Sequence, residues 1–146
     1  MSIMDFSTME DEIKNAPEPH ILAKGTEAQI RVIGINEGMS DKNGARWFMP
    51  RFDYPSDPMV KEFTQFFWNP LDSAKLTEKQ KQMNNYSFKQ FCACFGVDLS
   101  KPFAFEDLIG KEGWVIVGVQ KSDEYGEQNT ISKYVTGSAD SANSNY

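Results

Sequence analysis

The sequence predicts a mainly β domain, in which a five-stranded antiparallel barrel carries one α-helix between its third and fourth strands. Three observations lead to this fold class: three strand-like segments in the first half of the chain, one uninterrupted segment of helical periodicity after them, and two further strand-like segments near the C-terminus. With 146 residues, of which 40% are hydrophobic and 13% aromatic, the chain is long enough for one domain with a substantial core.

The first half of the chain contains three expected strands, because alternate residues of an extended chain show opposite faces. In the first strand, Ala28, Ile30 and Val32 fall on one face, and Gly34 indicates a bulge or a sharp bend. In the second, Pro50 indicates an edge position or a bulge. The three segments span residues 27–38, 46–54 and 60–69.

The period then changes to that of a helix. Thr77 followed by Gln80 has the form of a capping box, neither proline nor glycine interrupts the chain from there to Phe95, and Gly96 follows as a C-terminal cap. We therefore expect one amphipathic helix here. A short helical turn at 105–111 and two final strands at 113–120 and 128–135 complete the order.

Three strands, a helix and a final hairpin follow one another in the order of the OB-fold, a five-stranded Greek-key barrel. The alternative is another small antiparallel α+β domain. We expect the domain to occupy residues 25–135, between a flexible acidic N-terminal arm (1–24), with a helical turn near Met9 to Lys14, and a disordered polar C-terminal tail (136–146).

The composition argues against an enzyme. His20 is the only histidine, and Cys92 and Cys94 are the only cysteines, so neither a zinc site nor histidine-dependent catalysis is expected. A glycine-rich phosphate loop is also missing from the sequence. We therefore predict no enzymatic activity, no cofactor and no metal. The apolar runs are too short for a membrane span and the acidic start is unlike a signal peptide, which favours a cytoplasmic protein with no membrane partner.

Aromatic side chains occupy both faces of the third expected strand, in the segment EFTQFFWNP (62–70). Phe63 and Phe67 share one face with a lysine and a glutamine, while Phe66 and Trp68 share the other. An aromatic residue on a strand is usually core, but the polar neighbours make core and ligand platform equally reasonable roles for Phe63 and Phe67. Phe66 and Trp68 fit the core better, although a single bulge would exchange the two rows.

The second expected strand has the same mixed character, since Phe48 and Phe52 alternate with Trp47, Met49 and Arg51. Aromatic rings stack on bases, arginine and lysine neutralise phosphates, and strands two and three form the binding face of an OB-fold. The sequence therefore predicts a site for single-stranded DNA. The candidate residues are Arg31, Lys42, Arg46, Trp47, Arg51, Lys61, Phe63, Phe67, Trp68, Tyr125 and Lys133.

Three stretches resemble a family of phage proteins from replication and recombination modules: SDKNGARWFMPRFDYP, FKQFCACFGVDLSKPFAFEDLIGKEGWVIVGV and EYGEQNTISKYV. The motifs are Lys42 with Gly44, Phe91 with Gly96, Asp107 to Lys111, and Tyr125, Gly126 and Asn129 with Ile131. The resemblance covers roughly residues 25–135 and implies an OB-fold that binds and protects single-stranded DNA in phage DNA replication, recombination and repair.

The expected partner is therefore single-stranded DNA, bound by a monomer or a homodimer in the cytoplasm of an infected bacterium, with phage or host replication and recombination proteins as further partners. The tail has only Asp140 as an acidic residue, which argues against tail-mediated recruitment. The alternative function is a phage interaction or inhibitor module, because aromatic residues with arginine also mark protein hot spots. Salt separates the two, since it weakens DNA binding steeply.

Overall fold

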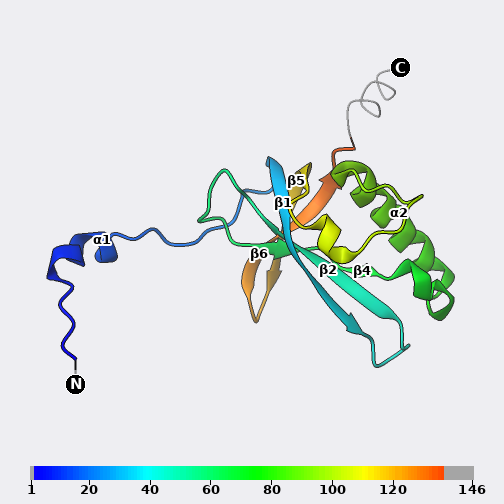
Figure 1. Cartoon of the computed structure of the whole chain (residues 1–146), viewed down its shortest axis with the longest axis horizontal. Coiled ribbons are helices and arrows are strands. Elements are labelled where there is room, and N and C mark those ends of the chain that lie inside the picture. Colours follow the sequence, from blue (N-terminus) through cyan, green and yellow to red (C-terminus); the bar gives the residue numbers. More distant parts are fainter. Residues whose placement is uncertain (1, 137–146) are drawn as a thin grey trace, which may run out of the picture.

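The computed structural model describes residues 2–136, and the chain is mainly β, as predicted (Figure 1). One open antiparallel sheet has the strand order β3-β2-β1-β5-β6, and β4 also pairs with β2. The strands are β1 (Glu27–Met39), β2 (Arg46–Asp53), β3 (Phe63–Thr64), β4 (Phe67–Trp68), β5 (Glu112–Ser122) and β6 (Gly126–Tyr134). The α-helices are α1 (Glu10–Lys14) and α2 (Glu78–Phe95), and the 3-10 helices are η1 (Ser7–Met9), η2 (Pro70–Lys75) and η3 (Phe105–Leu108).

The third expected strand, 60–69, is interrupted opposite Pro50. β3 and β4 pair with β2 in one continuous register, so the interruption does not change which side chains share a face. At the gap, the Gln65 N–H donates to the Pro50 carbonyl at 3.2 Å, but a proline has no N–H to return. The edge position that the sequence suggested for Pro50 is not observed, because β2 lies between β1 and the β3–β4 pair.

The bulge expected at Gly34 is confirmed. The pairing of β1 with β2 shifts register between Val32 and Gly34, so one extra residue of β1 is accommodated there. Upstream of the bulge, Ala28, Ile30 and Val32 are all buried, which confirms the alternation that the sequence indicated.

Helix α2 begins and ends where the sequence predicted. The Thr77 side chain accepts from the Gln80 N–H and the Gln80 side chain accepts from the Thr77 N–H, which completes the capping box. Gly96 ends the helix in the left-handed conformation, with φ of 71°. These local signals are sufficient to set both ends of the helix.

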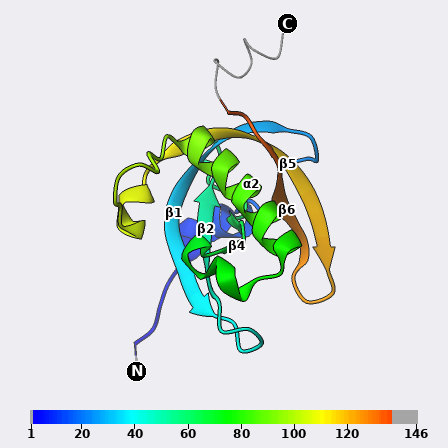
Figure 2. The same ribbon diagram turned by 90° about the vertical axis from the view of Figure 1, so that its right-hand side faces the viewer.

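The core lies between α2 and the concave side of the sheet; Figure 2 shows α2 in front of the curved strands. Phe91 of α2 has no exposed surface and contacts rings from both layers, including Phe52 and Phe67 of the sheet. Most of the core is therefore aromatic. Its phenylalanines are Phe48, Phe52, Phe63, Phe67, Phe88, Phe91 and Phe95.

The N-terminal arm extends away from the sheet, and its helices η1 and α1 bury none of their residues (Figure 1). The chain joins the domain at His20, whose N–H donates to Met59 and whose carbonyl accepts from Lys61. Two residues later, the buried Asn129 exchanges two hydrogen bonds with the backbone of Leu22. The predicted tail, apart from Thr136, lies outside the described residues.

Among residues 2–136, no helix has the length and the apolar character needed to cross a membrane.

Candidate nucleic-acid interface

Three aromatic side chains form a continuous surface on the outer face of β2 and β4, opposite the core. We call Trp47, Phe66 and Trp68 the outer aromatic cluster. Trp47 and Trp68 are cross-strand partners, and the ring centroid of Phe66 lies 5.9 Å from that of Trp47 and 5.0 Å from that of Trp68. Phe66 is 42% exposed, and both tryptophans are half-buried. The cluster therefore offers flat apolar surface to a ligand.

Two glycines of β1 let the neighbouring side chains lie close to the sheet. Trp47 packs over Gly38, its cross-strand partner, and Arg51 packs over Gly34 in the same way. A Cβ at either glycine would collide with the side chain above it. The absence of side chains at these two positions of β1 therefore allows the indole and the guanidinium to rest on its backbone.

Helix α2 holds the cluster from the other side. The Trp68 N–H donates to Oδ1 of Asn84 at 2.8 Å, and Nδ2 of Asn84 donates to the Trp68 carbonyl at 2.8 Å. One side-chain amide thus pairs with both backbone groups of Trp68 and fixes the end of β4. The position of Trp68 is consequently set by the sheet and the helix together.

The structure corrects the assignment of Phe63 and Phe67 as candidates for contact with DNA. Phe63 is only 4% exposed and Phe67 has no exposed surface, so both belong to the core. The register explains why: Phe63 lies opposite Phe52 and Phe67 opposite Phe48, and cross-strand partners share a face.

Phe66 and Trp68, expected to fit the core better, lie on the outer face instead. The polar neighbours that suggested the opposite assignment do not expose this face. Lys61 precedes β3, and Gln65, opposite Pro50, is itself partly buried. Of the aromatic candidates on this segment, only Trp68 lies in the outer aromatic cluster.

Each of the three candidate arginines is paired with a carboxylate. The pairs are Arg31 with Asp53, at 2.6 Å from Nη2 to Oδ2; Arg46 with Asp72, at 2.9 Å from Nε to Oδ2; and Arg51 with Glu62, at 3.4 Å from Nη1 to Oε1. Hydrogen bonds from Arg46 hold the pKa of the Asp72 carboxyl well below its ordinary value. A phosphate would therefore compete with a carboxylate at each arginine.

The remaining candidates are more dispersed. Lys42 is exposed in the turn between β1 and β2, and Lys61 is exposed just before β3. Tyr125, 65% exposed, lies in the turn between β5 and β6, and Lys133 is exposed on β6. Within residues 2–136 none of the three lysines makes an ion pair.

A groove continues the interface between β3 and β6, which lie close together without pairing. It has a volume of about 370 Å³, and we call it the β3–β6 groove. Met49 and Phe66 line it at the outer aromatic cluster, while Gln120, Gln128 and Thr130 line it from the β5–β6 hairpin. The structure thus connects β2, β3 and β6 in one surface. The polar residues of β5 and β6 carry no signal in the sequence that places them here, because only the three-dimensional approach of β6 to β3 brings them into the site.

The two cysteine thiols of the described residues are weakly acidic. Burial raises the pKa of the Cys92 and Cys94 thiols to about 11, so both are protonated near neutral pH and are poor nucleophiles. The Cys94 thiol also donates to the Trp114 carbonyl at 3.2 Å. In the part of the chain from 2 to 136, no three His, Cys, Asp or Glu side chains are grouped as metal ligands would be.

Fold and site together define a mainly β domain with an exposed aromatic surface on its outer face. Comparisons with protein-family models, with curated proteins and with solved structures found no match to the chain. The resemblance to phage replication and recombination proteins therefore stays a prediction that depends on the quoted motifs.

Proposed function

We propose that this protein binds single-stranded DNA with little sequence preference and protects it during phage DNA replication, recombination and repair. The observation that carries the proposal is the outer aromatic cluster, in which Trp47, Phe66 and Trp68 touch one another on the face away from the core. Stacking on aromatic side chains contributes about 1–3 kcal/mol per base and tolerates any sequence, because every base has a flat face.

The strand order supports an OB-fold for the domain. The order β3-β2-β1-β5-β6, with α2 between β4 and β5, is the order of an OB barrel opened between its third and fifth strands. In the proposed barrel β3 and β6 would be the neighbours across the opening. Bound DNA would run over β2 and β4 and along the β3–β6 groove.

Because each candidate arginine is already paired with a carboxylate, we expect base stacking to contribute more than phosphate contacts to the affinity for single-stranded DNA. The net charge is -6, and Lys42, Lys61 and Lys133 are the candidate cations without a carboxylate partner within residues 2–136. Each phosphate contacted on a single strand contributes about 0.7 to the slope of log K against log salt, so three lysines predict a slope of about −2. We therefore expect a shallower salt dependence than that of a basic DNA-binding protein.

The test is a fluorescence anisotropy titration of labelled oligo-dT, a dozen or more nucleotides long as a rough guide to a single OB-fold site. A duplex of equal length is the matched competitor, and both are titrated at several salt concentrations. We expect preference for the single strand, together with quenching of tryptophan fluorescence. Equal affinity for single strand and duplex would refute the stacking mechanism.

The pairing of all three arginines with carboxylates also favours a second candidate, an interaction or inhibitor module whose aromatic surface meets a protein. This function predicts that oligo-dT does not bind at all. The same titration therefore decides between the two functions.

A further inference from the structure

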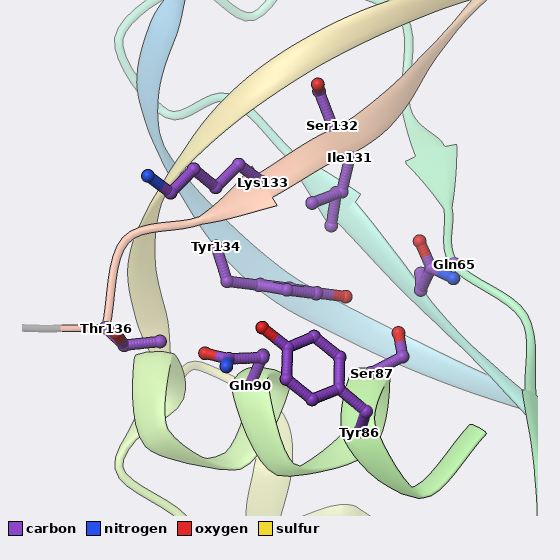
Figure 3. A pocket seen from close by; sticks show the side chains of 9 residues that line it. All are labelled: Gln65, Tyr86, Ser87, Gln90, Ile131, Ser132, Lys133, Tyr134 and Thr136. Carbon is purple, nitrogen blue, oxygen red and sulfur yellow. The ribbon is translucent and has the colours of Figure 1, made fainter. Parts of the chain in front are cut away.

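A second hollow, of about 390 Å³, opens between α2 and β6 (Figure 3). Tyr86, Ser87 and Gln90 line it from α2, and Lys133 and Tyr134 line it from β6. We call it the α2–β6 pocket. Its volume is near the lower end of the range of about 300–1,000 Å³ found for small-molecule sites, which is room for a single small group.

Gln65 connects this pocket with the candidate interface. It lines both the β3–β6 groove and the α2–β6 pocket. Its side-chain amide donates to the Phe66 carbonyl at 3.1 Å, which holds it beside the outer aromatic cluster. A strand lying along the groove therefore reaches the pocket by passing Gln65.

The lining of the pocket has the chemistry of a site for a nucleobase. Tyr86 is 65% exposed, so its ring is not needed for the core and is open to stacking. Gln90 and Ser87 both offer donors and acceptors to the edge of a base. Lys133 stands at the rim on β6, where it can meet a phosphate. Proteins read unstacked bases with this combination of aromatic ring, polar side chains and cation.

Tyr134 forms the inner wall of the pocket. Its side chain extends from β6 into the space between Ser87 and Ile131 (Figure 3). Tyr134 is only 9% exposed, and its buried hydroxyl has no hydrogen-bond partner within residues 2–136. Burial raises the pKa of Tyr134 far above its ordinary value, so the hydroxyl keeps its proton and stays a donor. An unpaired buried hydroxyl costs stability that a polar ligand group can offset.

We propose that the α2–β6 pocket takes one unstacked nucleotide of the bound single strand, with its base on Tyr86, its edge at Gln90 and Ser87, and its phosphate at Lys133. The inference rests on the proposed function and adds a second base site, connected to the first by Gln65. The two polar side chains of α2 would add hydrogen bonds to the edge of this base.

The test compares Tyr86→Ala with Met83→Ala, an exposed residue of the same helix that does not line the pocket. Oligo-dT of increasing length is titrated against each variant. We expect Tyr86→Ala to weaken the binding of oligonucleotides long enough to reach the pocket by about 5- to 140-fold, which is the stacking of one base. Short oligonucleotides that cover only the outer aromatic cluster should bind normally, and Met83→Ala should have no effect at any length.

A charge variant supplies a second readout. Lys133→Ala should reduce the salt slope for long oligonucleotides by about 0.7, and Lys89→Ala, an exposed lysine of α2 outside the pocket, should leave it unchanged. If Tyr86→Ala and Lys133→Ala both bind long oligonucleotides normally while Phe66→Ala weakens their binding, the pocket proposal is overturned and the proposed function stands. A wild-type protein that does not bind oligo-dT would overturn the proposed function and the pocket together.

Discussion

Two adjacent phenylalanines should respond to truncation in opposite ways. Phe67 has no exposed surface, and its ring centroid lies 5.5, 5.4 and 5.3 Å from those of Phe48, Phe88 and Phe91. Phe66 is 42% exposed and contacts only the two tryptophans of the outer aromatic cluster among the ring pairs of the described residues. Phe67→Ala should therefore affect folding, and Phe66→Ala should affect binding.

The magnitudes separate the two variants clearly. Truncation of a fully buried phenylalanine leaves a cavity and costs about 3–5 kcal/mol of stability. A small domain has only about 5–15 kcal/mol in total, so Phe67→Ala should move the urea midpoint strongly downward. Phe66→Ala should lose about 1–3 kcal/mol of oligo-dT binding, through one lost stacking partner, with little change in the midpoint.

The assays are urea denaturation followed by circular dichroism and anisotropy titration with labelled oligo-dT, both on the same two variants. Circular dichroism is preferred for unfolding because both tryptophans of the cluster are close to Phe66. If Phe66→Ala is as destabilised as Phe67→Ala, Phe66 belongs to the core and not to a binding surface. If Phe66→Ala binds oligo-dT as the wild type does, the outer aromatic cluster does not stack on bases.

Three further predictions concern charge and pH. Deletion through Pro19 removes four more negative than positive charges and, among residues 2–19, no buried residue. The melting temperature should therefore stay the same, and the oligo-dT affinity should stay the same or rise, mainly at low salt. A folded truncation that no longer binds would show that the arm is part of the site. Asp72→Asn should free Arg46 and tighten oligo-dT binding at low salt in anisotropy, whereas unchanged affinity would place Arg46 outside the DNA path. Because the folded pKa of Cys92 and Cys94 is raised from 9.0 to about 11, the unfolded chain loses these protons first, and stability in urea should fall as pH rises from about 9 to 11. Replacement of both cysteines by alanine should flatten that fall, and an unchanged pH profile would exclude the thiols as its cause.

The sequence predicts local structure well where a few neighbouring residues determine it. The two ends of α2 are predicted by the capping box of Thr77 and Gln80 and by the terminal Gly96, and the structure confirms both ends. The alternation of Ala28, Ile30 and Val32 likewise identifies the buried face of β1. In each case the signal lies within one turn or one short run of the chain.

The inward face of β3 and β4 could not be predicted in this way. Phe63 is buried because it shares a face with its buried cross-strand partner Phe52, and that partnership depends on register. Register is set by the packing of the whole sheet against α2, and a shift of one residue would reverse every side chain of the segment.

The arginines illustrate a second limit. Arg31 and Arg46 look like free cations in the sequence, but their carboxylate partners, Asp53 and Asp72, follow 22 and 26 residues later. The β1–β2 pairing brings Asp53 opposite Arg31, and the turn of η2 brings Asp72 to Arg46. Charge balance at a site is thus a property of the folded chain.

The amide of Asn84 also determines how the sheet ends. An unpaired strand edge presents backbone groups that can recruit a strand from another molecule, and this is a common origin of aggregation. By occupying both backbone groups of Trp68, Asn84 closes the edge of β4 to such recruitment at a point beside an exposed aromatic surface. Asn84→Ala would leave both backbone groups of Trp68 free. We expect such a variant to stay folded and to self-associate as its concentration rises. Asn84 therefore protects the strand edge as well as positioning Trp68.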